Sequence, residues 1–158
     1  QGCFGLYGEE MIRRMDLGDL DQIADYEKAI FTSPWKREDY EYELKNNPFA
    51  RYYVCEVDGK IAAYGGVWIT FEQAQITNLA VVPEYRRHGL GQQMLDILTN
   101  TAVQEGCETI SLEVRRSNDQ AIRLYERNGF VTINVRKGYY ADDHEDALFM
   151  MKAIGGME

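Results

Sequence analysis

Hydrophobic and polar residues alternate in several short stretches of the chain, and between these stretches the apolar residues recur at helical spacing. Alternation and enrichment in Tyr, Val and Ile predict strands over residues 12–15, 51–57, 61–69, 74–82, 109–114, 131–135 and 147–151. Amphipathic stripes predict helices over residues 19–31, 35–45, 89–106 and 118–129. The order β-α-α-β-β-β-α-β-α-β-β indicates an α/β fold with one central mixed sheet and helices on both faces.

The extent of the domain follows from length and from local signals. A chain of 158 residues is most simply one domain, which we place at residues 11–154 with a short tail at 155–158. Residues 1–10, QGCFGLYGEE, lack periodicity and precede Met11, so we set them aside from the fold argument as a leader, either an added remnant or a native extension. Inside the domain, Asp58-Gly59 predicts a hairpin turn and Asn118 can cap a helix.

The charge and the cysteines exclude several classes of protein. With 17 Lys and Arg against 26 Asp and Glu, the net charge is −9, which argues against general nucleic-acid binding and leaves open a cationic partner or simple solubility. No apolar run approaches the roughly 20 residues that would span a membrane. The spacing of the cysteines fits no metal site, and Cys55 and Cys107 are expected to be small core residues of a cytoplasmic protein.

The stretch VVPEYRRHGLGQQML, residues 81–95, places cationic side chains and two glycines directly before a helix. The free amides of a helix start suit an anion, and glycines let a phosphate approach the backbone. A P-loop lysine is missing, and Met94 breaks the dinucleotide fingerprint G-x-G-x-x-G. The pattern R-x-x-G-x-G is met by Arg86, Gly89 and Gly91. The alternative is a basic turn that holds no ligand.

A second stretch, SLEVRRSNDQAIRLYERNGF at residues 111–130, together with NLAVVPEYRRHGLGQQML at 78–95, resembles the acyl-CoA-binding part of the GCN5-related N-acetyltransferases (GNAT). FTSPW at 31–35 and RKGYYADDHEDALFM at 136–150 are similar to the ribosomal-protein alanine N-acetyltransferase (RimI-type) subfamily. The resemblance extends from about Met11 to Lys152. It implies the GNAT fold and acetyl-CoA as co-substrate. No cluster of His, Cys and carboxylate residues in the sequence suggests a metal.

The resemblance also implies which residues hold acetyl-CoA. Backbone groups of the strand before the glycine loop would bind the pantetheine arm, and Asn118 would touch the arm from the other side. The strand residues are Leu79, Ala80 and Val81. The loop would hold the pyrophosphate through Arg86, Arg87, His88, Gly89, Leu90, Gly91 and Gln92.

Acetyl transfer to an amine needs a base for the amine and an acid for the leaving thiolate. The resemblance assigns the base to Glu113, which strand alternation places on the face opposite Leu112 and Val114. The alternative is a solvent-facing glutamate in an ion pair with Arg115. The resemblance assigns the acid to Tyr125, for which the alternative is a core tyrosine with a satisfied hydroxyl.

The sequence indicates the acetyl acceptor less precisely than the cofactor. In the subfamily, the regions that contain Trp35, Tyr139 and Tyr140 border the peptide groove, and nearby acids at 142, 143, 145 and 146 suit a cationic peptide or form only a solvated turn. Thr32-Ser33 and Gly138 depart from some relatives. We expect acetylation of a protein N-terminal α-amine, on alanine of a small-subunit ribosomal protein, by a monomer or weak dimer. Lysine, a small amine or polyamine, and a non-catalytic CoA-binding module are the alternatives.

Overall fold

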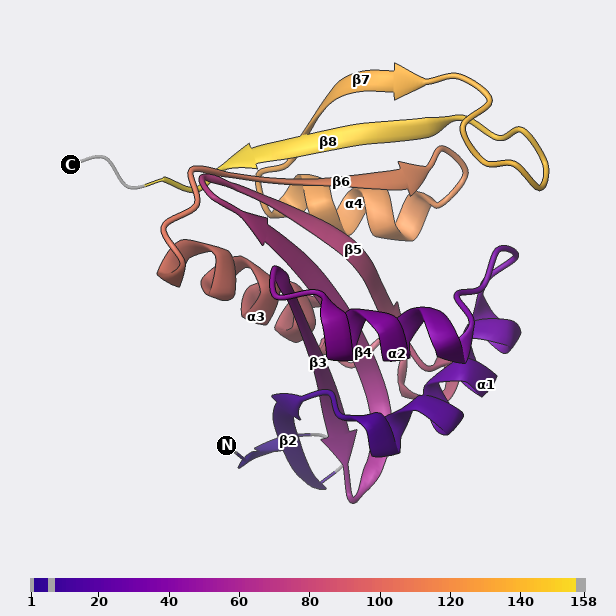
Figure 1. Ribbon diagram of the computed structural model, residues 1–158, viewed down its shortest axis with the longest axis vertical. Helices are drawn as coiled ribbons and strands as arrows, with labels where there is room; N and C mark the ends of the chain where they lie inside the picture. Colours follow the sequence, from indigo (N-terminus) through magenta and orange to yellow (C-terminus); the bar gives the residue numbers. More distant parts are fainter. Residues whose placement is uncertain (1, 6–7, 156–158) are drawn as a thin grey trace.

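The computed structural model describes residues 2–5 and 8–155, and describes side chains from residue 10 onward. Its eight strands form one sheet in the order β1-β2-β3-β4-β5-β6-β8-β7 (Figure 1). The strands are β1 Gly2–Gly5, β2 Gly8–Arg14, β3 Ala50–Val57, β4 Lys60–Thr70, β5 Gln73–Val81, β6 Thr109–Arg115, β7 Val131–Arg136 and β8 Ala147–Ala153. The helices are α1 Leu20–Ile30, α2 Arg37–Asn46, α3 Leu90–Gln104 and α4 Asp119–Arg127, with short 3-10 turns at Leu17–Asp19 and Pro83–Tyr85. The predicted α/β fold is confirmed.

One end of the sheet contains backbone that the sequence pattern did not predict as strand. β1 pairs antiparallel with β2, from Gly2 opposite Met11 to Gly5 opposite Gly8, and β2 pairs with β3. Residues 2–5 and 8–10 of the stretch that we set aside therefore lie in the sheet. Ladder hydrogen bonds join backbone groups, so a strand can form at an edge without alternating side chains. Residues 1 and 6–7, and residues 156–158 of the predicted tail, lie outside the described residues.

Two hydrophobic cores cover the two faces of the sheet. α1 and α2 lie on one face, and α3 and α4 on the other (Figure 1). Neighbouring residues of β3 show the division, because Val54 packs with the α1 side while Cys55 packs with the α3 side. Cys55 and Cys107 are buried core residues, as predicted. Burial also raises the pKa of the Cys107 thiol.

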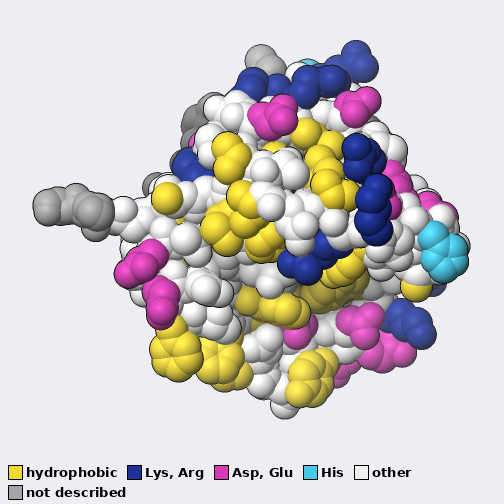
Figure 2. All heavy atoms as spheres, turned by 90° about the horizontal axis from the view of Figure 1, so that it is seen from above, with side chains coloured by type: hydrophobic (Ala, Val, Ile, Leu, Met, Phe, Trp, Pro, Cys, Tyr) yellow, Lys and Arg dark blue, Asp and Glu magenta, His cyan; other side chains and the backbone are white. Residues whose placement is uncertain are grey.

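The β7 end of the sheet is more open than its centre. Figure 2 views this end from above and shows hydrophobic side chains exposed among cationic and acidic ones. Val131 and Ile133 are 59% and 52% exposed. β7 is the edge strand at this end of the sheet and pairs antiparallel with β8.

The sheet opens between β5 and β6. These two strands are parallel and pair at only three positions, from Gln73 opposite Thr109 to Gln75 opposite Ser111. Beyond these positions the strands separate, as Figure 1 shows, although β5 continues to pair with β4 up to Val81. The second halves of β5 and β6 thus face each other without a hydrogen-bonded ladder.

Gly66 of β4 lies where the opposite strand and a buried ring come close. A Cβ at this position would lie 2.2 Å from Cε1 of Tyr52 and 2.9 Å from Oγ1 of Thr77. Tyr52 is 1% exposed, and its hydroxyl donates to Oε1 of Glu43 at 2.8 Å. The ring cannot move away without losing that hydrogen bond, so only glycine fits here.

We expect Gly66→Ala to lower the free energy of unfolding by about 1–3 kcal/mol, the range for overpacking a well-filled core. Urea denaturation followed by circular dichroism would measure it. Gly91→Ala is the matched control, because its Cβ would meet the nearest atom at an ordinary 3.6 Å. Equal stability of Gly66→Ala and the native chain would show that Tyr52 has room to shift.

Candidate active site

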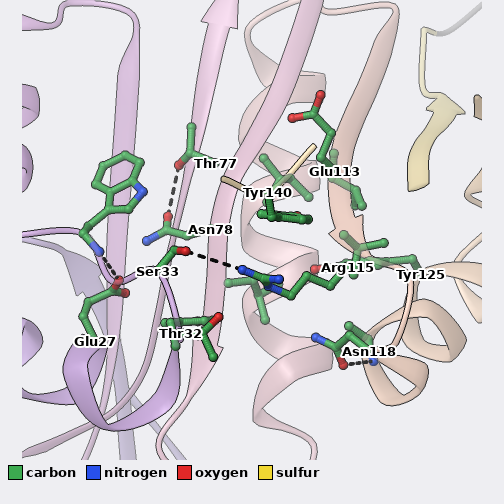
Figure 3. Close-up of a pocket in the computed structure, with 17 residues that line it drawn as sticks. Glu27, Thr32, Ser33, Thr77, Asn78, Glu113, Arg115, Asn118, Tyr125 and Tyr140 are labelled. Carbon is green, nitrogen blue, oxygen red and sulfur yellow. Dashed lines mark hydrogen bonds between the residues drawn. The ribbon is translucent and has the colours of Figure 1, made fainter. Parts of the chain in front are cut away.

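A cavity of about 220 Å³ occupies the opening between β5 and β6 (Figure 3). Its walls come from α1 and the loop after it, from residues 76–79 of β5, from residues 112–115 of β6, and from α4 and Tyr140. Because β5 and β6 separate only after Gln75, the parting of these strands creates the cavity. Its lining therefore includes residues from both faces of the sheet.

The cavity brings together six of the residues predicted for the site. These are Trp35, Leu79, Glu113, Asn118, Tyr125 and Tyr140. Tyr139 lies beside them, bonded to Glu113. Ala80 is instead buried in the core under α1 and α2, and Val81 ends β5. Residues 86–92 lie at the start of α3, outside the described lining of the cavity.

Glu113 is held by two partners from the far side of β8. The Tyr139 hydroxyl donates to Oε1 of Glu113 at 2.9 Å. Nε of Arg136 lies 2.8 Å from Oε2, and its guanidinium lies over the ring of Phe149, the β8 residue that pairs with Glu113. The alternative prediction of an ion pair between Glu113 and Arg115 is therefore wrong, because Glu113 pairs with Arg136 instead. The two contacts orient the carboxylate, which is 17% exposed.

Tyr125 approaches the cavity from the opposite face of β6. It packs in the core with Leu112 and Val114, while Glu113 lies on the other face of the strand. Its ring contacts Phe130 with centroids 5.6 Å apart. Burial raises the pKa of its phenol, so the hydroxyl stays protonated at neutral pH. No hydrogen-bond partner for this hydroxyl is found among the described residues, which leaves it able to donate into the cavity.

The Arg115 side chain lies in the cavity and contacts both the loop after α1 and the β7–β8 loop. Its guanidinium bonds to carboxylates of the β7–β8 loop and reaches Oγ of Ser33 at 3.4 Å in the loop after α1 (Figure 3). It also lies 3.9 Å from the ring centre of Tyr140. The carboxylate partners are Asp142 at 3.0 Å, Asp143 at 3.0 Å and Glu145 at 3.1 Å. The acidic loop is therefore paired within the protein rather than simply solvated.

These contacts shift the ionisation of the loop. Hydrogen bonds from Arg115 hold the pKa of Asp142 well below its usual value. Hydrogen bonds from Ser117 and then from Arg115 lower the pKa of Glu145. Because the folded-state pKa values are depressed, these ion pairs stabilise the fold above the unfolded-state pKa of about 4, and the contribution is lost as the pH falls further.

We therefore expect Arg115→Met to lower Tm at pH 7, and we expect the difference from the native chain to shrink below about pH 4. Thermal denaturation followed between pH 7 and the acid range would measure both. Arg116→Met is the control, since the Arg116 side chain is 57% exposed and lies 3.6 Å from its partner Asp146. If the Tm of the variant and of the native chain differ by the same amount down to low pH, the ion pairs between Arg115 and the three carboxylates do not stabilise the fold.

The start of α3 has the features of an anion site. Arg86 and Arg87 are exposed, and Gly89 adopts a φ of +84° directly before the helix, with open space where a Cβ would stand. No side chain caps the helix, so its first amides lack an acceptor within it. The Gln92 side chain, in contrast, exchanges hydrogen bonds with Asn128 at 2.8 Å and serves to join α3 to α4. A phosphate could reach the backbone here, so the residues present fit the predicted pyrophosphate.

Asn118 has a structural task as well as a place at the cavity. Its Oδ1 accepts from the amide of Ala121 at 3.2 Å and caps α4, as the sequence predicted. Its remaining side-chain amide group can still face a ligand. The cap also fixes the first turn of α4, the helix that carries Tyr125.

Several lining residues were not predicted for the site. Thr77, Asn78, Arg115 and Glu27 belong to the wall. Only Glu27 had a signal in the sequence, since it is a charged residue on the apolar stripe of its helix. The others are recognised only when β5, β6 and the loop after α1 are placed together.

The comparison with known proteins agrees with this geometry. A sequence model of the acetyltransferase (GNAT) family matches residues 20–130, which include α1 to α4 and the separated strands. The chain belongs to this family. It is accordingly a GNAT acyltransferase. Within the matched domain, the cavity lies where β5 and β6 separate. The loop before α3 carries the R-x-x-G-x-G pattern of Arg86, Gly89 and Gly91.

Two relatives place the chain more closely within the GNAT family, and a third protein shares its fold. A Bacillus subtilis (strain 168) protein, whose name proposes a ribosomal protein bS18-alanine N-acetyltransferase, is 42% identical over 143 residues, covering 90% of this chain and 95% of the relative. The crystal structure of the Escherichia coli ribosomal-protein-S18-alanine N-acetyltransferase has a TM-score of 0.85 and 30% identity, covering 94% of this chain and 96% of that one. Arabidopsis thaliana NAA60, solved with acetyl-CoA, shares the fold at a TM-score of 0.81 and 19% identity, covering 93% and 99%.

The described part of the chain has neither a metal-binding cluster nor a membrane-spanning helix. None of its groups of His, Cys, Asp and Glu side chains is arranged to hold a metal ion. Over the same residues, every helix is too short or too polar to cross a membrane.

Proposed function

We propose that this acetyltransferase moves the acetyl group of acetyl-CoA to the α-amine of a protein N-terminus, and that the acceptor is an N-terminal alanine of a small-subunit ribosomal protein. The observation that carries the proposal is the cavity that reaches both faces of the sheet, with Glu113 on one face and Tyr125 on the other. The names of the Bacillus subtilis and Escherichia coli relatives support this acceptor.

The binding of acetyl-CoA would use the backbone of β5 and the start of α3. Past Gln75, the edge of β5 that faces β6 has no ladder partner, so backbone groups near Leu79 to Val81 are available to the pantetheine arm. The Val81 carbonyl is an exception, because it accepts from Nε of Arg86 at 3.1 Å. The pyrophosphate would lie at the amides of α3 beside Arg86 and Arg87, and Asn118 would contact the arm from α4. An extended ligand beside a strand edge gains main-chain hydrogen bonds in the same way as an added strand.

The chemistry is direct attack of the amine on the thioester carbonyl. Glu113, directly or through water, would take the proton of the amine, while the carbon–sulfur bond breaks and Tyr125 gives its proton to the sulfur of CoA. A terminal α-amine has a pKa of about 7.7–8.0 against about 10.4 for lysine, so one carboxylate is a sufficient base for it. A phenol that burial keeps protonated is a suitable acid.

The acceptor wall is aromatic and lies in an acidic protein. Trp35 and Tyr140 line the cavity, and Tyr139 borders it through its bond to Glu113. With a net charge of −9, the protein would attract a cationic peptide. A cytoplasmic location and a monomer or weak dimer stay predictions from the sequence.

The test is the initial rate of CoA release with acetyl-CoA and an Arg-rich peptide that begins with Ala. A matched peptide has a blocked α-amine and a free lysine. We expect release with the first peptide only. Release with the blocked peptide, or with a polyamine in preference to either, would move the acceptor to lysine or to a small amine.

A further inference from the structure

Glu27 is a buried carboxylate on the wall of the cavity that the chemistry above does not use. It projects from the apolar face of α1, beside Leu20 and Ile23, and is 2% exposed. Burial raises its pKa, and no cationic side chain contacts it among the described residues. Such a group is costly in a core unless donors surround it.

Three donors from three different elements converge on this carboxylate. The amide of Trp35, in the loop after α1, donates to Oε1 at 2.9 Å. The Tyr40 hydroxyl of α2 and the Tyr64 hydroxyl of β4 donate to Oε2 at 3.0 Å and 2.8 Å. Figure 3 shows Glu27 at one end of the cavity, with Glu113 at the other. One side chain thus joins α1, its following loop, α2 and the sheet.

The same network reaches the strand that faces Glu113. The Asn78 side-chain amide donates to the Tyr40 hydroxyl, and the Thr77 hydroxyl donates to Oδ1 of Asn78. Trp35, whose amide Glu27 holds, packs on Tyr40 with ring centres 4.9 Å apart. Trp35, Thr77 and Asn78 all line the cavity. Hydrogen bonds thus connect Glu27 to these wall residues, directly for Trp35 and through Tyr40 for Asn78 and Thr77.

We propose that Glu27 is a positioning residue that sets the acceptor wall of the cavity through its hydrogen bonds to Trp35, Tyr40 and Tyr64. The inference rests on the proposed function only in naming this wall as the acceptor side. Glu27 does not take part in acetyl transfer. Its carboxylate places the loop after α1 and Asn78 where the amine must pass to reach the thioester.

The kinetic test compares Glu27→Leu with Glu27→Gln. Leucine removes every acceptor, and we expect the KM of the acceptor to rise about tenfold or more because the wall is displaced. The KM of acetyl-CoA should stay within about twofold of the native value, since its proposed site uses the backbone near Leu79 and the start of α3, which the hydrogen bonds of Glu27 do not reach directly. Glutamine keeps an acceptor for the Trp35 amide and can donate to the tyrosine hydroxyls, so it should restore the acceptor KM.

Glu43→Leu is the matched control. Glu43 also accepts from a tyrosine and a tryptophan, Tyr52 at 2.8 Å and Trp68 at 2.7 Å, but it does not line the cavity. Both leucine variants should lower Tm, and only Glu27→Leu should raise the acceptor KM. Equal changes of KM in the two variants, or a Glu27→Gln enzyme as impaired as Glu27→Leu, would overturn the proposal. Should Glu27→Leu not fold, Tyr40→Phe removes one of the three donors to Glu27 together with the acceptor of the Asn78 amide, and it should raise the acceptor KM in part. A native KM in this variant would count against the network.

A second readout does not depend on the identity of the acceptor. The chain has two tryptophans, so Trp68→Phe leaves Trp35 as the only one. In this background Glu27→Leu should make Trp35 fluorescence more accessible to acrylamide, and Glu27→Gln should not. Unchanged quenching in Glu27→Leu would refute the positioning role even if the proposed α-amine acceptor is correct. Increased quenching would support it even if the acceptor is lysine.

Discussion

Replacement of Glu113 by glutamine should lower kcat for an N-terminal alanine peptide by about 100-fold or more, the effect expected for a general base. Glutamine has the same shape and can still accept from the Tyr139 hydroxyl, but it cannot take a proton. The loss should be largest at neutral pH. It should shrink toward pH 9, because an α-amine with a pKa of about 7.7–8.0 is then already deprotonated. Initial rates of CoA release across this pH range would measure both effects.

The controls separate a lost base from a lost ion pair. Arg136→Met removes the cation beside Glu113 but keeps the carboxylate, so it should retain far more activity than Glu113→Gln. Glu126→Gln changes an exposed glutamate of α4 and should have no effect. If Glu113→Gln keeps the native kcat and pH profile, Glu113 serves only as the partner of Arg136 and Tyr139.

Tyr125→Phe should lower kcat by about 100-fold, at the lower end of the effects of general acids. Phenylalanine preserves the ring that packs on Phe130 and removes only the hydroxyl. Since this hydroxyl has no hydrogen-bond partner among the described residues, the substitution should leave Tm nearly unchanged. The KM of acetyl-CoA should also stay close to native, because the proton is needed when the thiolate leaves and not when the thioester binds.

The measurement is again kcat, with Tm recorded on the same samples. Tyr42→Phe is the control, since Tyr42 is 62% exposed and lies away from the cavity. A Tyr125→Phe enzyme with native kcat would mean that solvent protonates the leaving thiolate. A large fall in Tm would instead indicate that the hydroxyl has a structural task.

The sequence by itself determined the order of the elements and the local geometry within them. Strand alternation correctly separated Glu113 from Leu112 and Val114, because side chains of a strand point to opposite faces whatever lies beyond them. The cap at Asn118 and the hairpin at Asp58-Gly59 were also predicted, since both involve only neighbouring residues. The family pattern in residues 78–95 and 111–130 indicated which of these residues would form a site.

Only the tertiary structure decided which side chains meet. It paired Glu113 with Arg136 across β8, and it gave Arg115 three carboxylates from the β7–β8 loop. It parted β5 from β6 to form the cavity, and it surrounded Glu27 with donors from three elements. These contacts join residues far apart in the chain, and they depend on sheet order, register and the separation of strands. Periodicity and capping report only local backbone geometry, so they predict the elements but not the contacts between them.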